Sequence, residues 1–171
     1  MIKLFEPSEK YLKSYIDAYN EQKNLPNSGY HFSDPSLEDI FQKYENYKYE
    51  KNLPSDRVGA SYFWLVDDEK DYFIGEVNIR HRLNAFLERY AGHIGYVVRC
   101  SEWNKGYGTL MLKLALEEAR KLGLGKVLVT CDDDNIASSR VMEKNGFVFT
   151  DKITNVIDGE TILTRRYWKT L

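Results

Sequence analysis

Residues 93–109 read HIGYVVRCSEWNKGYGT, a predicted strand and a short loop followed by the start of a predicted helix. The strand is expected over 92–99, and the helix begins at the glycines Gly106 and Gly108. The first N–H groups of a helix have no intrahelical acceptor and lie at the positive end of its dipole. Glycine there lets a phosphate approach the backbone without meeting a Cβ. The stretch therefore predicts an anion-binding helix N-terminus, with Lys105 as a neighbouring positive charge.

The known nucleotide motifs do not describe this stretch. The third glycine of GxGxxG would fall at Met111, and the sequence GxxxxGK[ST] does not occur. A glycine pair before a helix is also typical of an ordinary tight turn, so these residues alone do not predict a function. A second segment, 134–147, follows a predicted strand and opens another predicted helix.

The remaining chain predicts an α+β fold with the element order βααβββαβαββ. Strands are expected over 2–5, 61–66, 72–80, 92–99, 126–130, 147–156 and 160–168, and helices over about 9–22, 36–50, 106–122 and 136–145. Ser8 is a candidate N-cap, Pro26 to Gly29 should break the first helix, and Asp158-Gly159 is typical of a hairpin turn. Residues 81–91 are ambiguous and are compatible with a short helix.

Length and composition limit the class of protein. A chain of 171 residues without repeats or linkers predicts one domain over 1–171. The 24 basic and 26 acidic residues give a net charge of −2, which argues against a nucleic-acid partner. No apolar run approaches the ~20 residues of a membrane span, and no signal peptide is visible, so we expect a cytoplasmic protein without a membrane partner. Two separate cysteines and the run Asp132 to Asp134 predict neither a disulfide framework nor a metal site.

Taken together, the two segments resemble the GNAT family of acyl-CoA-dependent N-acetyltransferases. The cofactor loop of that family has the pattern Q/R-x-x-G-x-G/A, and residues 103–108 read WNKGYG. The later family motif, N-x-x-S/A followed by E-K-x-G-F, is matched by Asn135, Ser138, Glu143, Lys144, Gly146 and Phe147. A bacterial subgroup of predicted GNAT acetyltransferases is similar through GEVNIRH (75–81), GHIGYVVR (92–99) and LVTCDDDNIAS (128–138).

The resemblance covers about residues 60–168, and the N-terminal third matches only in the order of its elements. It implies an α+β, GNAT-like single domain. In such a domain a central, mixed and mostly antiparallel sheet of about seven strands is flanked by about four helices.

The resemblance also implies where acetyl-CoA would bind. Its pyrophosphate would be held by backbone amides of Asn104, Lys105, Gly106, Tyr107, Gly108 and Thr109. Its pantetheine arm would pair with the backbone around Tyr96, Val97, Val98 and Arg99, beside Asn135 and Ser138 or Ser139. Trp103 stands where the family usually has Gln or Arg, which leaves Lys105 or Arg99 as the nearby cation.

The reaction needs a group that removes a proton from the attacking amine. About one lysine-like amine in a thousand is neutral near pH 7.4, and losing the proton costs roughly 4 kcal/mol. Glu76, on a strand expected to border the acceptor cleft, is the first candidate base, followed by His93 and then His81. A salt-bridged glutamate or a structural histidine is the alternative for each.

The general acid is less evident than the base. Family members often carry a tyrosine where this chain has Met142. Tyr96, Tyr107 and Ser139 are the other hydroxyl groups that are available near the motifs.

The expected function is therefore transfer of acetyl from acetyl-CoA to a primary amine by direct attack in a ternary complex. The amine belongs to a small molecule or a peptide, and the protein is a monomer or a homodimer. Met142 and Trp103 favour an alternative, a non-catalytic acyl-CoA-binding sensor or partner protein on the same fold. An interaction protein without a ligand is the third interpretation.

Overall fold

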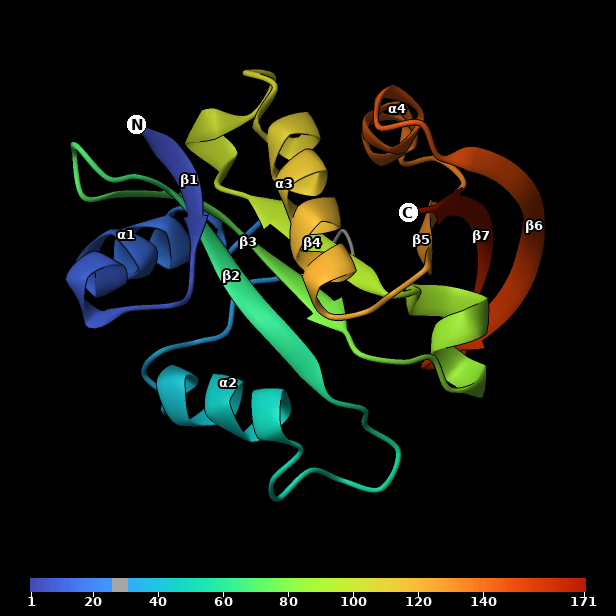
Figure 1. Cartoon of the computed structure of the whole chain (residues 1–171), viewed down its shortest axis with the longest axis horizontal. Helices are drawn as coiled ribbons and strands as arrows, with labels where there is room; N and C mark the ends of the chain where they lie inside the picture. The colour runs from blue at the N-terminus through green and yellow to red at the C-terminus, as the bar shows by residue number, and fades with distance from the viewer. Residues whose placement is uncertain (26–30) are drawn as a thin grey trace.

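The computed structural model describes residues 1–25 and 31–171, which form seven strands and four α-helices (Figure 1). The first sheet has the order β1-β2-β3-β4, with β1 (Ile2–Phe5), β2 (Ala60–Asp67), β3 (Tyr72–Arg80) and β4 (Ile94–Val98). The second has the order β5-β7-β6, with β5 (Lys126–Asp132), β6 (Val148–Ile157) and β7 (Glu160–Thr170). The helices are α1 (Leu12–Gln22), α2 (Ile40–Tyr49), α3 (Tyr107–Lys121) and α4 (Ile136–Lys144).

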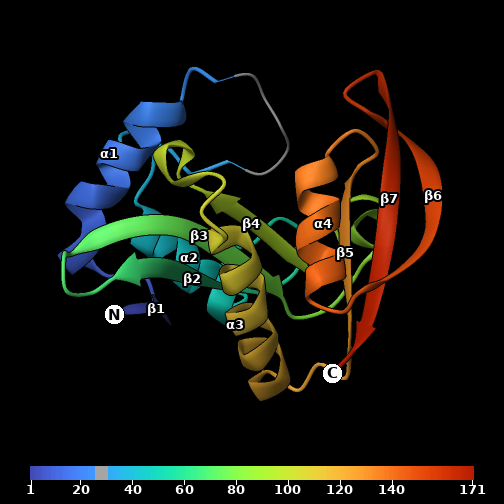
Figure 2. The same ribbon diagram turned by 90° about the horizontal axis from the view of Figure 1, so that it is seen from above.

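The α+β class and the numbers of strands and α-helices are confirmed for this part of the chain. The strands nevertheless lie in two sheets rather than one, and each pairing within them is antiparallel. The sheets approach each other where the N–H of His93 donates to the carbonyl of Leu128 at 2.7 Å. Beyond that point β4 pairs with β3 and β5 pairs with β7, and Figure 2 shows the second sheet turned at an angle to the first.

Two apolar cores explain how the helices cover the first sheet. Alternate residues of a strand point to opposite faces. Trp64 and Val66 of β2 are packed with residues of α1 and α2, whereas Leu65 is packed with residues of α3. The helices α1 and α2 therefore cover one face of the sheet and α3 covers the other.

Side-chain caps account for the observed helix boundaries. Ser8 accepts a hydrogen bond from the Lys10 N–H at 3.3 Å, as predicted, but a 3₁₀ turn over Glu9–Tyr11 precedes α1. The helix expected from residue 36 begins at Ile40, because the Asp39 carboxylate caps the Gln42 N–H at 3.0 Å. The break predicted at Pro26 to Gly29 lies outside the described residues.

The ambiguous segment 81–91 contains a single π-helical turn, Leu87–Ala91. Arg80 stabilises the end of this turn, because its guanidinium donates hydrogen bonds to the carbonyls of Ala91 and Gly92 at 2.9 and 3.0 Å. The turn leads directly into β4 and to the place where the two sheets meet.

Candidate active site

Three segments singled out from the sequence meet at Gly108, in the first turn of α3. A Cβ at this position would lie 3.4 Å from the Val141 side chain, 3.9 Å from that of Val98 and 4.0 Å from the Tyr96 ring. The Asn145 amide adds a hydrogen bond to the Thr109 carbonyl at 3.2 Å. The start of α3 thus packs against both the end of β4 and α4.

The N-terminus of α3 has the features of an anion site. Gly106 is the N-cap, with φ of +84°, and it offers no side-chain cap. The first bond of the helix runs from the Leu110 N–H to the Gly106 carbonyl at 3.1 Å, so the N–H groups of Tyr107, Gly108 and Thr109 have no acceptor within the helix. A Cβ on Gly106 would meet nothing within 4 Å. The space beside Gly106 is therefore open next to these three N–H donors.

The loop before α3 folds onto the end of β4. The Trp103 indole donates to the Val98 carbonyl at 2.8 Å, and 52% of Trp103 remains exposed. Lys105 is exposed and pairs with Glu102 at 2.9 Å, which raises the pKa of its ammonium. Asn104, with φ of +63°, forms the turn between them. Lys105 thus remains a surface cation beside the helix N-terminus.

Arg99 does not supply the nearby cation that the sequence suggested. Its buried guanidinium forms a two-point ion pair with Glu21 of α1 and lies 4.5 Å from the Tyr72 ring. The same ion pair lowers the pKa of Glu21. The Arg99 side chain therefore joins α1 to the end of β4. Its backbone is engaged as well, because its N–H donates to the Ile74 carbonyl at 2.8 Å and its carbonyl accepts from the Glu102 N–H at 2.9 Å.

Hydroxyl groups from β4 and α4 face each other. The Tyr96 hydroxyl lies 2.8 Å from the Ser138 Oγ, and burial raises the pKa of Tyr96. Ser139 is buried and bonds to the Tyr167 hydroxyl at 3.0 Å. Met142 is fully buried in the core that α3 and α4 share.

Asn135 acts as the N-cap of α4. Its side-chain oxygen accepts from the Ser138 N–H at 3.1 Å, and its carbonyl accepts from the Ser139 N–H at 3.2 Å. The motif residues Asn135 and Ser138 are therefore hydrogen-bonded to each other within the protein itself.

Glu76 lies on the other face of the sheet, inside the aromatic cluster beneath α1 and α2. It is fully buried, and its Oε2 accepts from the Tyr44 hydroxyl at 2.5 Å and from the Trp64 indole at 2.9 Å. Across the strands, Glu76 pairs with Trp64 on one side and with Val97 on the other. It is thus the direct neighbour of the β4 segment expected to bind pantetheine.

The sequence did not identify Tyr44 and Trp64 as the donors to Glu76. For Trp64 a signal was available, because pairing the two strands of the predicted hairpin over 61–80 places it opposite Glu76. Tyr44 lies 32 residues before Glu76 in the chain, so no local pattern identified it as a donor.

His93 is far from Glu76. It precedes Val97 on β4 by four residues, roughly 13 Å along a strand. Its ring nitrogen Nδ1 accepts from the Leu128 N–H at 3.0 Å, and burial lowers its pKa to about 4. A nitrogen that already accepts an amide N–H is poorly placed to take a proton from a substrate. His81 is also engaged, through the Ser61 hydroxyl at 2.9 Å.

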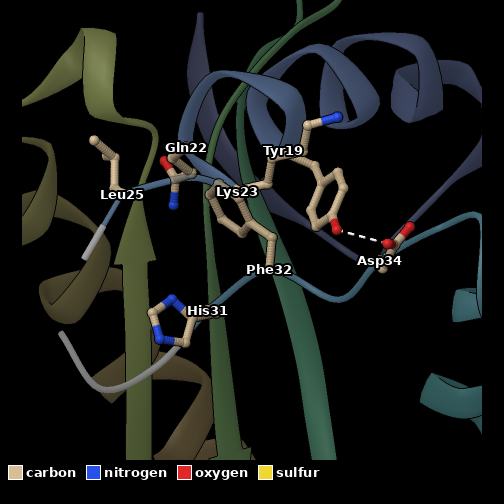
Figure 3. Close-up of a pocket in the computed structure, with 7 residues that line it drawn as sticks. All are labelled: Tyr19, Gln22, Lys23, Leu25, His31, Phe32 and Asp34. Carbon is tan, nitrogen blue, oxygen red and sulfur yellow. Dashed lines mark hydrogen bonds between the residues drawn. The ribbon is translucent and has the colours of Figure 1, made fainter. Parts of the chain in front are cut away.

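Two hollows flank the aromatic cluster. One of about 220 Å³ lies at the end of α1 (Figure 3) and is lined by Tyr19, Gln22, Lys23, Leu25, His31, Phe32 and Asp34. The other, of about 240 Å³, lies between α2 and β2 and has Tyr44, Tyr62 and Glu45 in its lining. Tyr44 therefore connects this second hollow to Glu76.

Within the described residues no group of three metal-binding side chains gathers. No helix of residues 1–25 or 31–171 is long and apolar enough to cross a membrane.

The sequence profile described as "Acetyltransferase (GNAT) domain" matches residues 6–148. A search of curated proteins gives no match to the chain.

Solved structures share the fold over nearly the whole chain. The ribosomal L7/L12 alpha-N-protein acetyltransferase RimL in complex with coenzyme A is 16% identical, with a TM-score of 0.74, and the match covers 99% of this chain and 94% of that one. The microcin C7 self-immunity acetyltransferase MccE in complex with acetyl-CoA and AMP is 20% identical, with a TM-score of 0.72, over 99% and 92%. A GNAT-family acetyltransferase from Bacillus anthracis is 17% identical, with a TM-score of 0.71, over 99% and 94%.

Proposed function

Because the chain belongs to the family of the acetyltransferase (GNAT) domain, we propose that it transfers acetyl from acetyl-CoA to a primary amine. The observation that carries this proposal is the convergence of the start of α3, the end of β4 and the C-terminal half of α4 at Gly108. Two of the structural neighbours contain coenzyme A or acetyl-CoA, which supports the choice of donor.

The α3 N-terminus fits the pyrophosphate of that donor. The N–H groups of Tyr107, Gly108 and Thr109 supply hydrogen-bond donors and the positive end of the dipole. The space beside Gly106 lets the phosphate oxygens reach them, and Lys105 adds a charge at the rim. The loop from Asn104 to Thr109 is thus the proposed pyrophosphate site.

The pantetheine arm is proposed to lie along Val97 and Val98 and beside Arg99, with Asn135, Ser138 and Ser139 across from it. Acetyl-CoA supplies the activated acetyl group there. The Tyr96 hydroxyl, paired with Ser138, is the group that we assign to protonate the departing sulfur. A phenol is protonated at neutral pH even at its ordinary pKa of about 10, so Tyr96 carries a proton that it can donate to the thiolate, although burial raises its pKa and makes it a weaker acid.

The proton of the attacking amine is assigned to Glu76. Glu76 is the cross-strand neighbour of Val97, and Tyr44 and Trp64 fix its carboxylate in one orientation. His93 is not assigned this role, because its Nδ1 already accepts the Leu128 N–H. The base is therefore expected to act from the face covered by α1 and α2.

The cofactor site can be tested with a matched pair of glycines. Gly106 and Gly123 lie at opposite ends of α3, have φ of +84° and +83°, and have open space around them. We expect Gly106→Asp to weaken acetyl-CoA binding in calorimetry by about tenfold or more, since it places a negative charge beside the phosphate donors. Gly123→Asp should leave the affinity unchanged. Equal affinities in both variants would place the cofactor elsewhere.

Turnover separates the enzyme from the non-catalytic alternative, which Met142 and Trp103 favour because they stand where the family often has other residues. Thiol release from acetyl-CoA should accelerate in the presence of at least one member of a panel of small amines and peptides. Tight binding of acetyl-CoA without turnover by any amine would favour the acyl-CoA-binding sensor.

A further inference from the structure

The junction between the two sheets depends on His93. Its backbone N–H donates to the Leu128 carbonyl at 2.7 Å, and its ring Nδ1 accepts from the Leu128 N–H at 3.0 Å. A single residue of β5 is therefore held at both of its backbone groups by one residue that immediately precedes β4.

The ring takes a place that a backbone carbonyl has in an ordinary ladder. The carbonyl of His93 faces the other way, where it accepts from the Arg80 N–H of β3 at 2.7 Å. His93 consequently serves β3 through its carbonyl and β5 through its N–H and ring. A residue without a side-chain acceptor at this position would leave the Leu128 N–H without that partner, at a site where only 7% of His93 is exposed.

The neighbouring residues keep the junction narrow. Gly92 has φ of +63°, and a Cβ on it would lie 2.5 Å from the Leu128 carbonyl oxygen. The Trp168 ring of β7 packs on the His93 imidazole with a centroid distance of 6.2 Å. The distance between β5 and His93 is thus limited by Gly92 on one side and by Trp168 on the other.

We infer that His93 is a positioning residue for the proposed cofactor site: by holding Leu128 it fixes the point from which β4 and β5 separate. Tyr96 and Val98, which meet the start of α3, follow only three and five residues later, roughly 10 to 17 Å along the strand. Movement at the junction would therefore change the spacing between β4 and α4. The inference rests on the proposed function for its cofactor part only.

The tautomer of His93 in the unmodified protein gives the first test. Long-range proton–nitrogen NMR spectra at neutral pH should show a neutral ring protonated at Nε2, because Nδ1 accepts. A ring protonated at Nδ1 would overturn the inference. No variant is needed for this measurement.

Two substitutions then separate the acceptor from the bulk of the ring. His93→Asn places an amide oxygen where Nδ1 lies, whereas His93→Leu fills the space without an acceptor. We expect exchange of the Leu128 amide to be about tenfold faster, and acetyl-CoA binding about tenfold weaker, in His93→Leu, with His93→Asn close to the unmodified protein. If His93→Leu does not fold, His93→Gln replaces it, since its amide extends past the Nδ1 position.

Val66→Ala provides the control for a general loss of stability. Val66 is fully buried in the cluster beneath α1 and α2, away from the junction. The Val66→Ala variant should have a lower melting temperature and an unchanged acetyl-CoA affinity. Equal Leu128 exchange and equal affinity in the leucine and asparagine variants would overturn the positioning role alone. Failure of the unmodified protein to bind acetyl-CoA would instead overturn the proposed function.

Discussion

Glu76 is a carboxylate that two aromatic side chains hold in a fully buried position. Tyr44 and Trp64 both donate to its Oε2, and the adjoining rings exclude water. A carboxylate in such surroundings keeps one orientation, which is what a group that must receive a proton from a bound amine requires.

Replacing Glu76 by glutamine tests that role with little disturbance of the packing. The glutamine carbonyl can accept from both Tyr44 and Trp64, but it cannot take a proton at neutral pH. We expect kcat to fall about 10²- to 10⁴-fold, while KM for acetyl-CoA changes little. Steady-state kinetics with one good amine would measure this, and an unchanged kcat would exclude Glu76 as the base.

Glu76→Ala is the matched structural comparison. It leaves two buried donors without their carboxylate acceptor, which costs roughly 1–3 kcal/mol for each. Denaturant unfolding should therefore show a large loss for alanine and a small one for glutamine. Equal losses in the two variants would mean that these hydrogen bonds contribute little.

The helix α4 begins at a side-chain cap that belongs to the same motif as the proposed cofactor site. Asn135→Ala removes the acceptor of the Ser138 N–H and should cost about 1 kcal/mol of stability. In a chain of this size that loss lowers the melting temperature by about 2–4 °C.

Asn135→Ser retains a capping oxygen and should keep most of that stability. If acetyl-CoA affinity falls in the alanine variant and recovers in the serine variant, the cap acts by ordering α4. If affinity falls in both while the melting temperature recovers, the amide itself contacts the ligand.

Local sequence patterns predicted most elements but not every boundary. The strand from residue 2 and the hairpin around Asp158-Gly159 followed from alternation and turn chemistry. The helix α2 starts later than predicted because Asp39 caps it, and hydrophobic periodicity alone does not locate a cap. The cofactor motifs gave the loop before α3 and the start of α4 because their signals lie within short segments.

Contacts between distant segments account for the remaining differences. Glu21 lies 78 residues before Arg99, so no local pattern indicated that their ion pair would occupy the guanidinium. Likewise, Leu128 lies 35 residues after His93, so no local pattern indicates that the imidazole has a backbone partner instead of acting as a base. The separation into two sheets also arises at that junction.

The junction makes the stability of the whole fold depend on pH. Burial, aided by the positive Arg80, lowers the pKa of His93 to about 4 from 6.5 in the unfolded chain. Between these values the unfolded chain binds a proton that the folded chain does not. The free energy of unfolding should therefore fall as the pH drops from 6.5 to 4, by up to about 3 kcal/mol.

Comparison with His93→Asn isolates this contribution. The charged groups that face the ring are Arg80, which acts on it directly, and Lys126, whose ammonium lies 4.4 Å from the Trp168 ring that packs on it. Both are present in His93→Asn, so the comparison removes only the imidazole. Urea unfolding at several pH values should give a shallower decline for the asparagine variant. Parallel curves for the two proteins would show that His93 titrates normally in the folded state.

The two sheets, the α3 N-terminus and α4 together form the proposed acetyl-CoA site. At a concentration one hundred times its Kd, a ligand adds about 2.7 kcal/mol of stability, so binding itself is readily detected by thermal unfolding. The location of the ligand needs a measurement that resolves segments of the chain.

Hydrogen exchange of the full chain, with and without saturating acetyl-CoA, tests that location most directly. The N–H groups of Tyr107, Gly108 and Thr109 are the proposed phosphate donors, so exchange in 104–109 should slow markedly, together with that of 96–99 and 135–139. Exchange at the β6–β7 turn around Gly159 should not change. Stabilisation by acetyl-CoA without slower exchange in 104–109 would contradict the proposed site, and the absence of any stabilisation would contradict binding altogether.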